Sequence, residues 1–183
     1  LRTIQLCPPS SRNGKLCWRM TDQKFRIEKF DKASHDRGAF SCGVAGMDRW
    51  FKESITDQIK ANRIRVWCAV GKNDQVVGFY ALSAHSVEPS TASELAIRRE
   101  RHSIPAVYLS ALATDQSVQG QGLGSALMAD AMLKAFEISE VIGAAALILD
   151  VLDDGRGDQR MKFYLNLGFA PIDPTGNPMR LFL

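Results

Sequence analysis

A glycine-rich run between a predicted strand and a predicted helix constrains this chain more than any other feature. Val107–Thr114 predicts a strand, Ser125–Ile138 predicts a helix, and the run QGQGLGS at Gln119–Ser125 lies between them. Its three glycines at alternate positions leave the backbone bare, so consecutive N–H groups can converge on one point at the start of a helix. The run therefore predicts a phosphate-binding loop, with a plain glycine-rich turn as the alternative.

The residues around this run narrow down the phosphate ligand. A dinucleotide-binding loop has G-x-G-x-x-G directly after the strand, whereas here Asp115–Gln119 precedes the glycines and Ser125 occupies the sixth position. A nucleotide-hydrolase loop requires Gly-Lys-Ser/Thr, and no such tripeptide follows. The pattern that matches is Gln-x-x-Gly-x-Gly, at Gln119, Gly122 and Gly124. It resembles the coenzyme A pyrophosphate loop of the GNAT N-acetyltransferases.

Length and composition set the general class of protein. The 183 residues fit one domain with a single core, and 45% hydrophobic and 23% charged residues are ordinary for a globular protein. No stretch approaches the ~20 apolar residues that span a bilayer, so we expect no membrane segment. Cysteines stand at Cys7, Cys17, Cys42 and Cys68, without a C-x-x-C pair. This scatter favours reduced thiols in a cytoplasmic protein over a metal site.

Alternating elements predict one α/β domain with a mixed central β-sheet flanked by helices. The order is β-α-β-β-β-α-β-α-β, which is typical of such a domain. The predicted strands are Phe25–Phe30, Arg65–Val70, Val76–Ser83, Val107–Thr114, Ala144–Val151 and Met179–Leu183, and the predicted helices are Asp48–Lys60, Ser125–Ile138 and Arg160–Leu167.

The first residues look separate from this domain. Cys7–Lys15 is loop-like and lacks the apolar core of a secretory signal. We expect residues 1–20 to be a leader, either disordered or an artefact of upstream translation or cloning, and residues 21–183 to form the domain.

Further motifs extend the resemblance to the GNAT layout from about Phe25 to the end of the chain. F-Y-x-x-x-G-F at Phe163–Phe169 is a frequent signature of that family. A narrower group of motifs is similar to those of the GNAT toxins of bacterial toxin–antitoxin pairs. These motifs are Phe40–Gly43, Val77–Leu82, Ile104-Pro105 and Val141–Ala144.

The resemblance to GNAT toxins implies a function and partners. It implies acetylation of the amino group of aminoacyl-tRNA, which blocks translation, and a small ribbon-helix-helix antitoxin; we also expect a homodimer. The chain departs from the family pattern at Ala111, where an arginine is frequent, and in the longer, glycine-rich segment 153–159. Acceptor specificity is therefore left open.

The resemblance also implies the residues of an acetyl-CoA site. Backbone groups at the end of the strand would align the thioester, and loop amides would hold the pyrophosphate. The predicted cofactor-binding residues are Leu112, Ala113, Thr114, Gln119, Gly120, Gln121, Gly122, Leu123, Gly124 and Ser125. Tyr164 would protonate the coenzyme thiolate. Its alternative role is that of a core residue among Phe163, Leu167 and Phe169.

Basic residues and the absence of an obvious base bear on the acceptor. Two basic groups predict contacts with RNA, or else are solvated surface. They are Lys60, Arg63 and Arg65, and Arg98, Arg99 and Arg101. A lysine acceptor, with a pKa of ~10.4, needs a base that no residue supplies visibly, whereas an α-amine at ~7.7–8.0 is partly neutral already. This favours an α-amine or aminoacyl-tRNA as the acceptor. Two alternatives remain: a small-molecule amine acetyltransferase, which the basic groups disfavour, and a non-catalytic module that binds coenzyme A, which Tyr164 and the intact loop disfavour.

Overall fold

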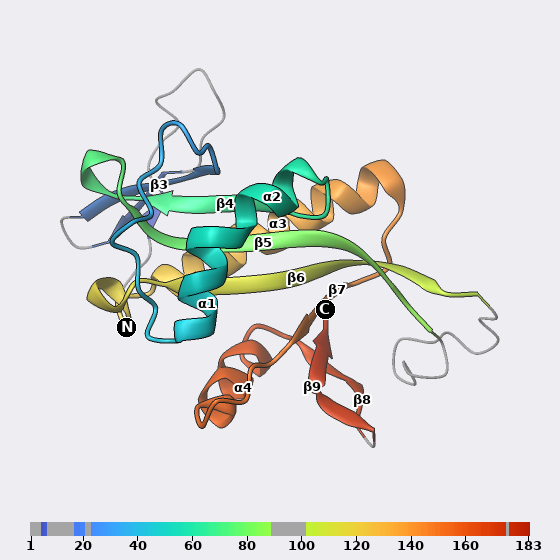
Figure 1. Ribbon diagram of the computed structural model, residues 1–183. Helices are drawn as coiled ribbons and strands as arrows, with labels where there is room; N and C mark the ends of the chain where they lie inside the picture. Colours follow the sequence, from blue (N-terminus) through green and yellow to red (C-terminus); the bar gives the residue numbers. More distant parts are fainter. Residues whose placement is uncertain (1–4, 7–16, 21–22, 89–101, 175) are drawn as a thin grey trace. The chain divides into compact units, whose positions relative to one another are not determined.

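The computed structural model describes residues 5–6, 17–20, 23–88, 102–174 and 176–183. These residues form strands and helices in the alternating order expected of an α/β fold (Figure 1).

The chain divides into two compact units. Strands β5 (Val76–Val87) and β6 (Ile104–Thr114) and helix α3 (Leu123–Ile142) each contribute residues to both. The first unit comprises Leu1–Leu82 and Ala111–Ala131, and the second comprises Ser83–Ser110 and Met132–Leu183.

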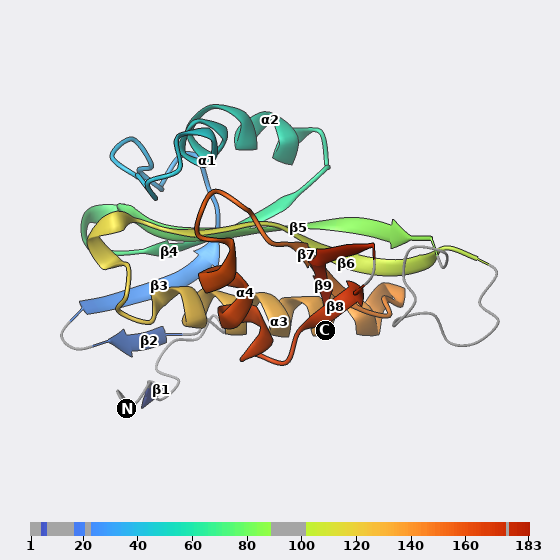
Figure 2. The same ribbon diagram turned by 90° about the horizontal axis from the view of Figure 1, so that it is seen from below.

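The first unit is an antiparallel sheet with helices on both faces. Its further elements are β1 (Gln5–Leu6), β2 (Cys17–Met20), β3 (Gln23–Lys29), α1 (Ala45–Arg49), the π-helical η1 (Trp50–Ser54), α2 (Ile55–Lys60) and β4 (Arg65–Val70). The strands lie in chain order, β1-β2-β3-β4-β5, each antiparallel to the next. Helices α1 and α2 lie on one face of β4 and β5, and the first half of α3 lies on the other (Figure 2).

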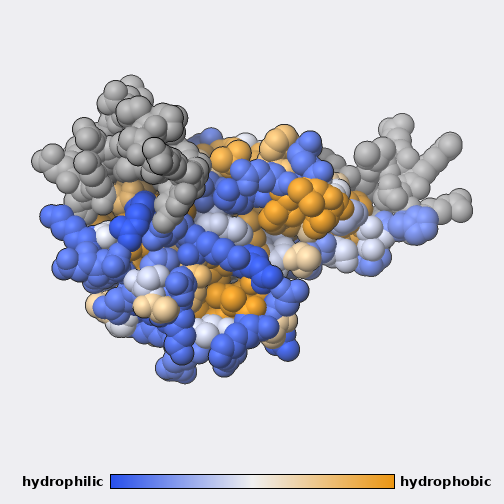
Figure 3. Space-filling model, turned by 90° about the horizontal axis from the view of Figure 1, so that it is seen from above, coloured by the Kyte–Doolittle hydropathy of each residue, from blue (hydrophilic) through white to orange (hydrophobic). Residues whose placement is uncertain are grey.

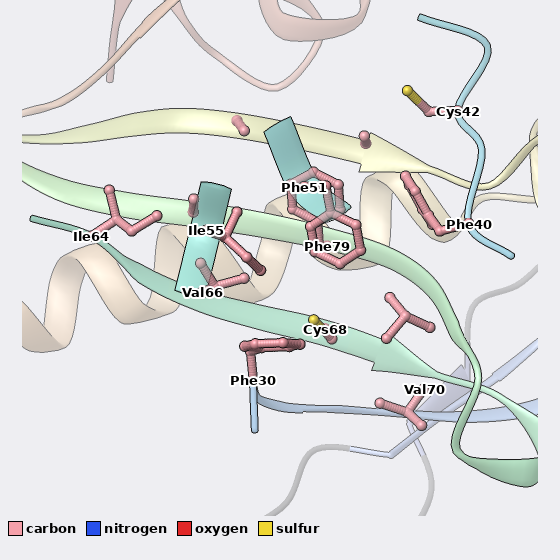
Figure 4. Packing of buried hydrophobic residues seen from close by; sticks show 14 residues of the cluster. Phe30, Phe40, Cys42, Phe51, Ile55, Ile64, Val66, Cys68, Val70 and Phe79 are labelled. Atoms are coloured by element: carbon pink, nitrogen blue, oxygen red, sulfur yellow. The ribbon is translucent and has the colours of Figure 1, made fainter. Parts of the chain in front are cut away.

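A hydrophobic cluster joins α1 and α2 to the strands beneath them. Phe51 stacks on Phe79 with ring centroids 3.9 Å apart, and Phe40 packs edge-on to Phe79 at 5.4 Å. Figure 4 shows Ile55 in the same cluster, beside Val66 of β4. The helix predicted here is present, but η1 interrupts its α-helical hydrogen bonding. Apolar spacing predicts which face of a helix is buried and does not specify its hydrogen-bond pattern.

Close contacts hold the first half of α3 against β5. A Cβ on Gly78 would lie 2.9 Å from Leu127 and 3.2 Å from Leu123, so glycine allows the helix to approach the strand. The buried Tyr80 hydroxyl donates to the buried Asp130 carboxylate at 2.5 Å. These contacts position the N-terminus of α3, where the glycine-rich loop ends.

The second unit contains the parallel pair of the sheet. Its further elements are β7 (Leu147–Asp150), α4 (Gly157–Leu165), β8 (Ala170–Asp173) and β9 (Asn177–Phe182). Here the strand order is β6-β7-β9-β8, with β6 and β7 parallel and the other pairs antiparallel. A parallel pair needs a long crossover, which α3 supplies. The predicted mixed sheet is therefore confirmed.

Some element boundaries differ from the prediction. Helix α3 begins at Leu123 rather than Ser125, and α4 begins at Gly157, inside the glycine-rich segment. Strand β8 was not predicted, because Pro171 lies within only four residues of strand. Its pairing with β9, between Ala170 and Phe182 and onward, gives it the regular structure that its own sequence does not indicate.

The predicted leader falls largely outside the described residues. Within residues 1–20, the structure describes only β1 and β2, and β2 pairs antiparallel with β3. The expectation that residues 1–20 are a leader stays a prediction.

Several large apolar side chains are exposed at the surface. Phe136, Val141 and Ile142, in the second half of α3, are more than half exposed, at 63%, 82% and 68%. Figure 3 shows hydrophobic areas interrupting a mainly hydrophilic face of the molecule. Within the described ranges, no helix has the length and apolar character needed to cross a membrane.

Candidate active site

The end of β6 leads directly into the glycine-rich loop. Leu112–Thr114, which we expect to align the thioester, ends the strand. A 3-10 turn, η4 (Gln116–Val118), follows, and α3 begins at Leu123. The side chains of Val118 and Leu123 are buried, so the core anchors the loop on both sides.

Glycine gives this loop its conformation and leaves it uncovered. Gly120 and Gly122 have φ angles of 73° and 90°, in the left-handed region that other residues rarely adopt. A Cβ on Gly120 or Gly124 would meet no neighbouring atom within 4 Å. Within the described part of the chain, the space where a side chain would begin at these two positions is therefore open.

The first turn of α3 supplies backbone amides without helical partners. The Ala126 N–H donates to the Gly122 carbonyl at 3.1 Å. The N–H groups of Leu123, Gly124 and Ser125 precede this bond and have no acceptor within the helix. Together with the positive end of the helix dipole, they suit an anion, and the arrangement fits the diphosphate of coenzyme A.

A segment that precedes α1 holds the beginning of the loop. The Asp115 carboxylate accepts a hydrogen bond from the Ser41 N–H at 2.8 Å, and the Gln116 N–H donates to the Ser41 carbonyl at 2.8 Å. The Gln119 side-chain amide donates to the Cys42 carbonyl at 2.9 Å. We call this set of three hydrogen bonds the clasp.

The clasp gives the Gln119 side chain a role inside the protein. Its amide also donates to the Thr114 carbonyl at 3.0 Å, so both N–H groups of the amide have protein acceptors. The side chain thus joins the strand end to the Ser41–Gly43 segment. That Gln119 binds the cofactor stays a prediction.

Two features secure the clasp from the side of α1. Gly43 has a φ of 87°, and a Cβ there would lie 2.6 Å from the Gln116 side-chain nitrogen. Asp48 accepts hydrogen bonds from the Ser41 hydroxyl at 2.9 Å and the Cys42 N–H at 2.8 Å. A larger residue at position 43 would therefore strain the backbone there and displace the Gln116 side chain.

The surroundings keep the Asp115 carboxylate charged and the Cys42 thiol neutral. Burial alone would raise the pKa of Asp115, but hydrogen bonds from Ser117 and from the Ser41 amide outweigh it and hold this pKa below its usual value. Burial, followed by the hydrogen bond with Asp48, raises the pKa of Cys42 to about 11.

Sequence reasoning missed the clasp. The sequence shows Phe40–Gly43 only as a family motif and Asp115 only as part of the spacer between strand and loop. Gly43 was a partial signal, since a conformation that favours glycine is required there. Ser41 and Asp115 are separated by 74 positions, and no local pattern relates them.

Tyr164, the predicted proton donor, lies near the end of α4. Its ring packs edge-on against Phe163 at 5.2 Å and Phe169 at 5.8 Å, as the core interpretation predicts. The residue is nevertheless partly exposed, and no group among the described residues hydrogen-bonds to its hydroxyl. Burial raises the pKa of Tyr164, so the hydroxyl is protonated at neutral pH, as a proton donor must be.

One of the two basic groups can be located. Lys60 and Arg63 are exposed at the end of α2 and in the turn after it. The Arg65 guanidinium donates to the Ile64 carbonyl at 3.0 Å and to the Asn62 side chain. The second predicted group, Arg98, Arg99 and Arg101, lies outside the described residues.

Comparison with protein families identifies the chain. A model of the acetyltransferase (GNAT) domain matches residues 62–171. The chain belongs to the GNAT acetyltransferase family. The predicted fold and the predicted enzyme class, an N-acetyltransferase, are therefore confirmed.

Three similar GNAT proteins are toxins. A probable toxin TacT from Sinorhizobium fredii is 36% identical over 163 residues, which are 86% of this chain and 89% of that protein. A tRNA-acetylating toxin from Mycobacterium tuberculosis is 33% identical over 150 residues, 81% of this chain and 85% of that one. The toxin AtaT complexed with acetyl-methionyl-tRNAfMet has a TM-score of 0.75 at 28% identity, covering 87% of this chain and 94% of AtaT. A mutant AtaT bound to the C-terminus of the antitoxin AtaR and acetyl-CoA has a TM-score of 0.70 at 27% identity, covering 87% and 92%.

These relatives confirm the predicted likeness of this GNAT acetyltransferase to the GNAT toxins. The roles of individual residues, from the loop to Tyr164, stay predictions. Among the His, Cys, Asp and Glu side chains of the described part of the chain, no three lie close enough to hold a metal ion.

Proposed function

We propose that this protein is a toxin that transfers the acetyl group of acetyl-CoA to the α-amino group of aminoacyl-tRNA and so blocks translation. One observation carries the proposal. The chain is 33% identical to a tRNA-acetylating toxin over 81% of its length. The uncovered glycines and free amides at the start of α3 support it, because they fit the diphosphate of the coenzyme.

A few groups of this chain carry out the acetyl transfer. When bound, acetyl-CoA supplies the acetyl thioester. Amides from Gly120 to Ser125 hold its diphosphate, and backbone groups of Leu112–Thr114 align the thioester and polarise its carbonyl. The neutral acceptor amine attacks the carbonyl carbon, the carbon–sulfur bond breaks, and Tyr164 delivers a proton to the departing sulfur. The nitrogen loses its surplus proton, which returns to the Tyr164 oxygen through solvent.

The acceptor is proposed to be held partly by phosphate contacts. Lys60 and Arg63 are exposed and can reach tRNA phosphates, whereas the guanidinium of Arg65 already bonds to its own turn. We assign phosphate contacts to Lys60 and Arg63 first. Arg98, Arg99 and Arg101 are proposed as a second set.

The proposed partners follow from the same relationship. AtaT binds the antitoxin AtaR, and we propose that this chain binds a small antitoxin of the ribbon-helix-helix type and forms a homodimer. A toxin that acts on aminoacyl-tRNA works in the compartment of translation, so we propose a cytoplasmic location.

A labelling experiment tests the function. Purified protein would be incubated with radiolabelled acetyl-CoA and either a bacterial tRNA pool charged with amino acids or a set of polyamines and aminoglycosides. We expect label on charged tRNA that mild alkali releases as N-acetyl amino acid, and no label on uncharged tRNA. Labelling of the small amines alone would refute the proposal in favour of a small-molecule acetyltransferase.

A further inference from the structure

A cluster of polar side chains, distinct from the loop and from Tyr164, spans four strands of the second unit. It consists of His85 on β5, Tyr108 on β6, Asp150 on β7 and Arg180 on β9, and we call it the polar cluster. Sequence reasoning assigned none of these residues a role. The sheet brings them together, since Asp150 lies directly opposite Arg180 in the β7–β9 register.

The Asp150 carboxylate is the centre of this cluster. The Arg180 guanidinium donates to both of its oxygens, from Nε to Oδ1 at 2.7 Å and from a terminal nitrogen to Oδ2 at 2.8 Å. The Tyr108 hydroxyl donates to Oδ2 at 2.9 Å. The His85 ring lies against the Tyr108 ring, with centroids 5.2 Å apart. Bidentate pairing of this kind fixes the direction of the carboxylate.

The cluster is accessible to a ligand. The side chains of Asp150 and Arg180 keep 36% and 32% of their exposure, unlike those of a buried ion pair. Tyr108 is only partly buried and packs against a buried hydrophobic cluster that includes Ile148 and Ile172. The Asp150 carboxylate is therefore open to a polar group of a ligand.

The charges of the cluster favour a neutral donor. Hydrogen bonds from Arg180, above all, hold the pKa of Asp150 below its usual value, so the pair is an ionised carboxylate beside a guanidinium with no net charge. Burial, followed by the hydrogen bond to Asp150, raises the pKa of Tyr108 to about 12 and keeps its hydroxyl neutral. Carboxylate Oδ1 and the Tyr108 oxygen each retain a free lone pair.

These features suit the amine that an acetyltransferase needs. An unpaired carboxylate would hold an acceptor as an ammonium ion, which has no lone pair with which to attack a thioester. Arg180 neutralises Asp150, so the cluster can accept N–H hydrogen bonds without strongly favouring the charged form. Tyr108 also lies on the same strand, β6, as Leu112–Thr114, the residues proposed to align the thioester.

We propose that Tyr108 and Asp150, oriented by Arg180, form the site that binds the aminoacyl end of the acceptor tRNA through its α-amino group. This inference rests on the proposed function. It adds the contacts by which charged tRNA is distinguished from uncharged tRNA.

Two variants and a matched control test it. Tyr108→Phe removes one hydroxyl and Asp150→Asn removes one charge. Asp74→Asn is the control, because it changes an exposed aspartate that pairs with Arg26 in the first unit. Each protein would be assayed for acetyl-CoA affinity, for affinity to charged and uncharged tRNA pools, and for kcat and KM.

Loss of the amine contacts should appear only with charged tRNA. We expect Tyr108→Phe to raise KM for charged tRNA about tenfold, the usual value of a hydrogen bond of this kind. Affinities for uncharged tRNA and for acetyl-CoA should stay as in the wild type. Asp150→Asn should act in the same direction, and Asp74→Asn should change none of these quantities.

The outcomes separate this inference from the function on which it rests. Suppose that the wild type acetylates charged tRNA while Tyr108→Phe lowers the affinities for charged and uncharged tRNA equally, or lowers neither affinity. In either case the proposed amine site is wrong and the proposed function stands. If the wild type acetylates no charged tRNA, both are wrong. Should Asp150→Asn fail to fold, as thermal melting would reveal, Tyr108→Phe still decides, because it preserves the ring that packs on the hydrophobic cluster.

Discussion

In the clasp, the side chains of Asp115 and Gln119 hydrogen-bond to the Ser41–Gly43 segment. Immediately afterwards, a Cβ on Gly120 or Gly124 would have no neighbour within 4 Å among the described residues. One half of the loop is attached to the body of the first unit, and the other half is bare. Because a donor N–H that is bonded to a protein carbonyl is not available to a phosphate, we expect attachment and ligand binding to depend on different groups of the loop.

This difference predicts two kinds of mutant. Substitutions in the clasp should act through the position of the loop and through stability. Substitutions at uncovered groups should act on the ligand or the reaction with little effect on folding. The Tyr164 hydroxyl is of the second kind, because no described group bonds to it.

The largest expected effect is at Tyr164. Tyr164→Phe keeps the ring that packs on Phe163 and Phe169 and removes only the hydroxyl. We expect kcat to fall by ~10²–10⁴, the usual value of general-acid catalysis, with acetyl-CoA affinity unchanged. Steady-state kinetics with charged tRNA would measure this. Near-normal turnover would place Tyr164 in the core alone and leave the thiolate to another proton source.

The next largest effect is expected at Gly120, in the uncovered part of the loop. Gly120→Asp adds a negative charge where a diphosphate is proposed to bind, and we expect the Kd for acetyl-CoA to rise about 100-fold. Gly143→Asp is the matched control, since Gly143 also has a positive φ of 68° and no neighbour within 4 Å of a Cβ. In both variants the unfolding free energy should fall by about 1–2 kcal/mol, because aspartate replaces glycine in the left-handed conformation. Calorimetric titration should find weakened binding in Gly120→Asp only; equal Kd values in the two variants would refute the loop assignment.

A smaller effect on acetyl-CoA binding is expected from a substitution in the clasp. Gln119→Leu removes the hydrogen bonds to the Cys42 and Thr114 carbonyls, which water can partly replace. We expect the unfolding free energy to fall by about 1 kcal/mol and KM for acetyl-CoA to rise about fivefold, with kcat unchanged. Gln75→Leu, at an exposed position, is the control and should leave KM unaltered. A large loss of binding without loss of stability would instead make the Gln119 side chain a direct phosphate ligand.

The smallest effect concerns acid stability. The folded-state pKa of Asp115 is lower than in an unfolded chain, so its charged form stabilises the fold above the unfolded value and this contribution is lost as pH falls below about 4. Asp115→Asn removes the titrating group. Urea unfolding at pH 7, 5 and 3 should show the variant weaker at neutral pH but less sensitive to acid than the wild type. Identical pH profiles would mean that the clasp carboxylate contributes nothing to folding.

Much of the loop could be predicted because its chemistry is local. Three glycines between a strand and a helix allow few ligands, and the spacing from Gln119 to Gly124 by itself excludes the dinucleotide and nucleotide-hydrolase loops. The buried face of the helix over Phe51 and Ile55 was equally local, because apolar spacing reports burial.

The predicted strands and helices from Phe25 onward, the glycine loop and the family were thus determined by the sequence alone, since each depends on residues a few positions apart, whereas β8 needed its partner strand. The clasp and the polar cluster were decided by the tertiary structure. Ser41 meets Asp115, and Tyr108 and Arg180 meet at Asp150, only after the strands pair in register. Hydrogen bonds between such distant residues depend on orientation and separation to within an ångström, and the packed sheet sets both.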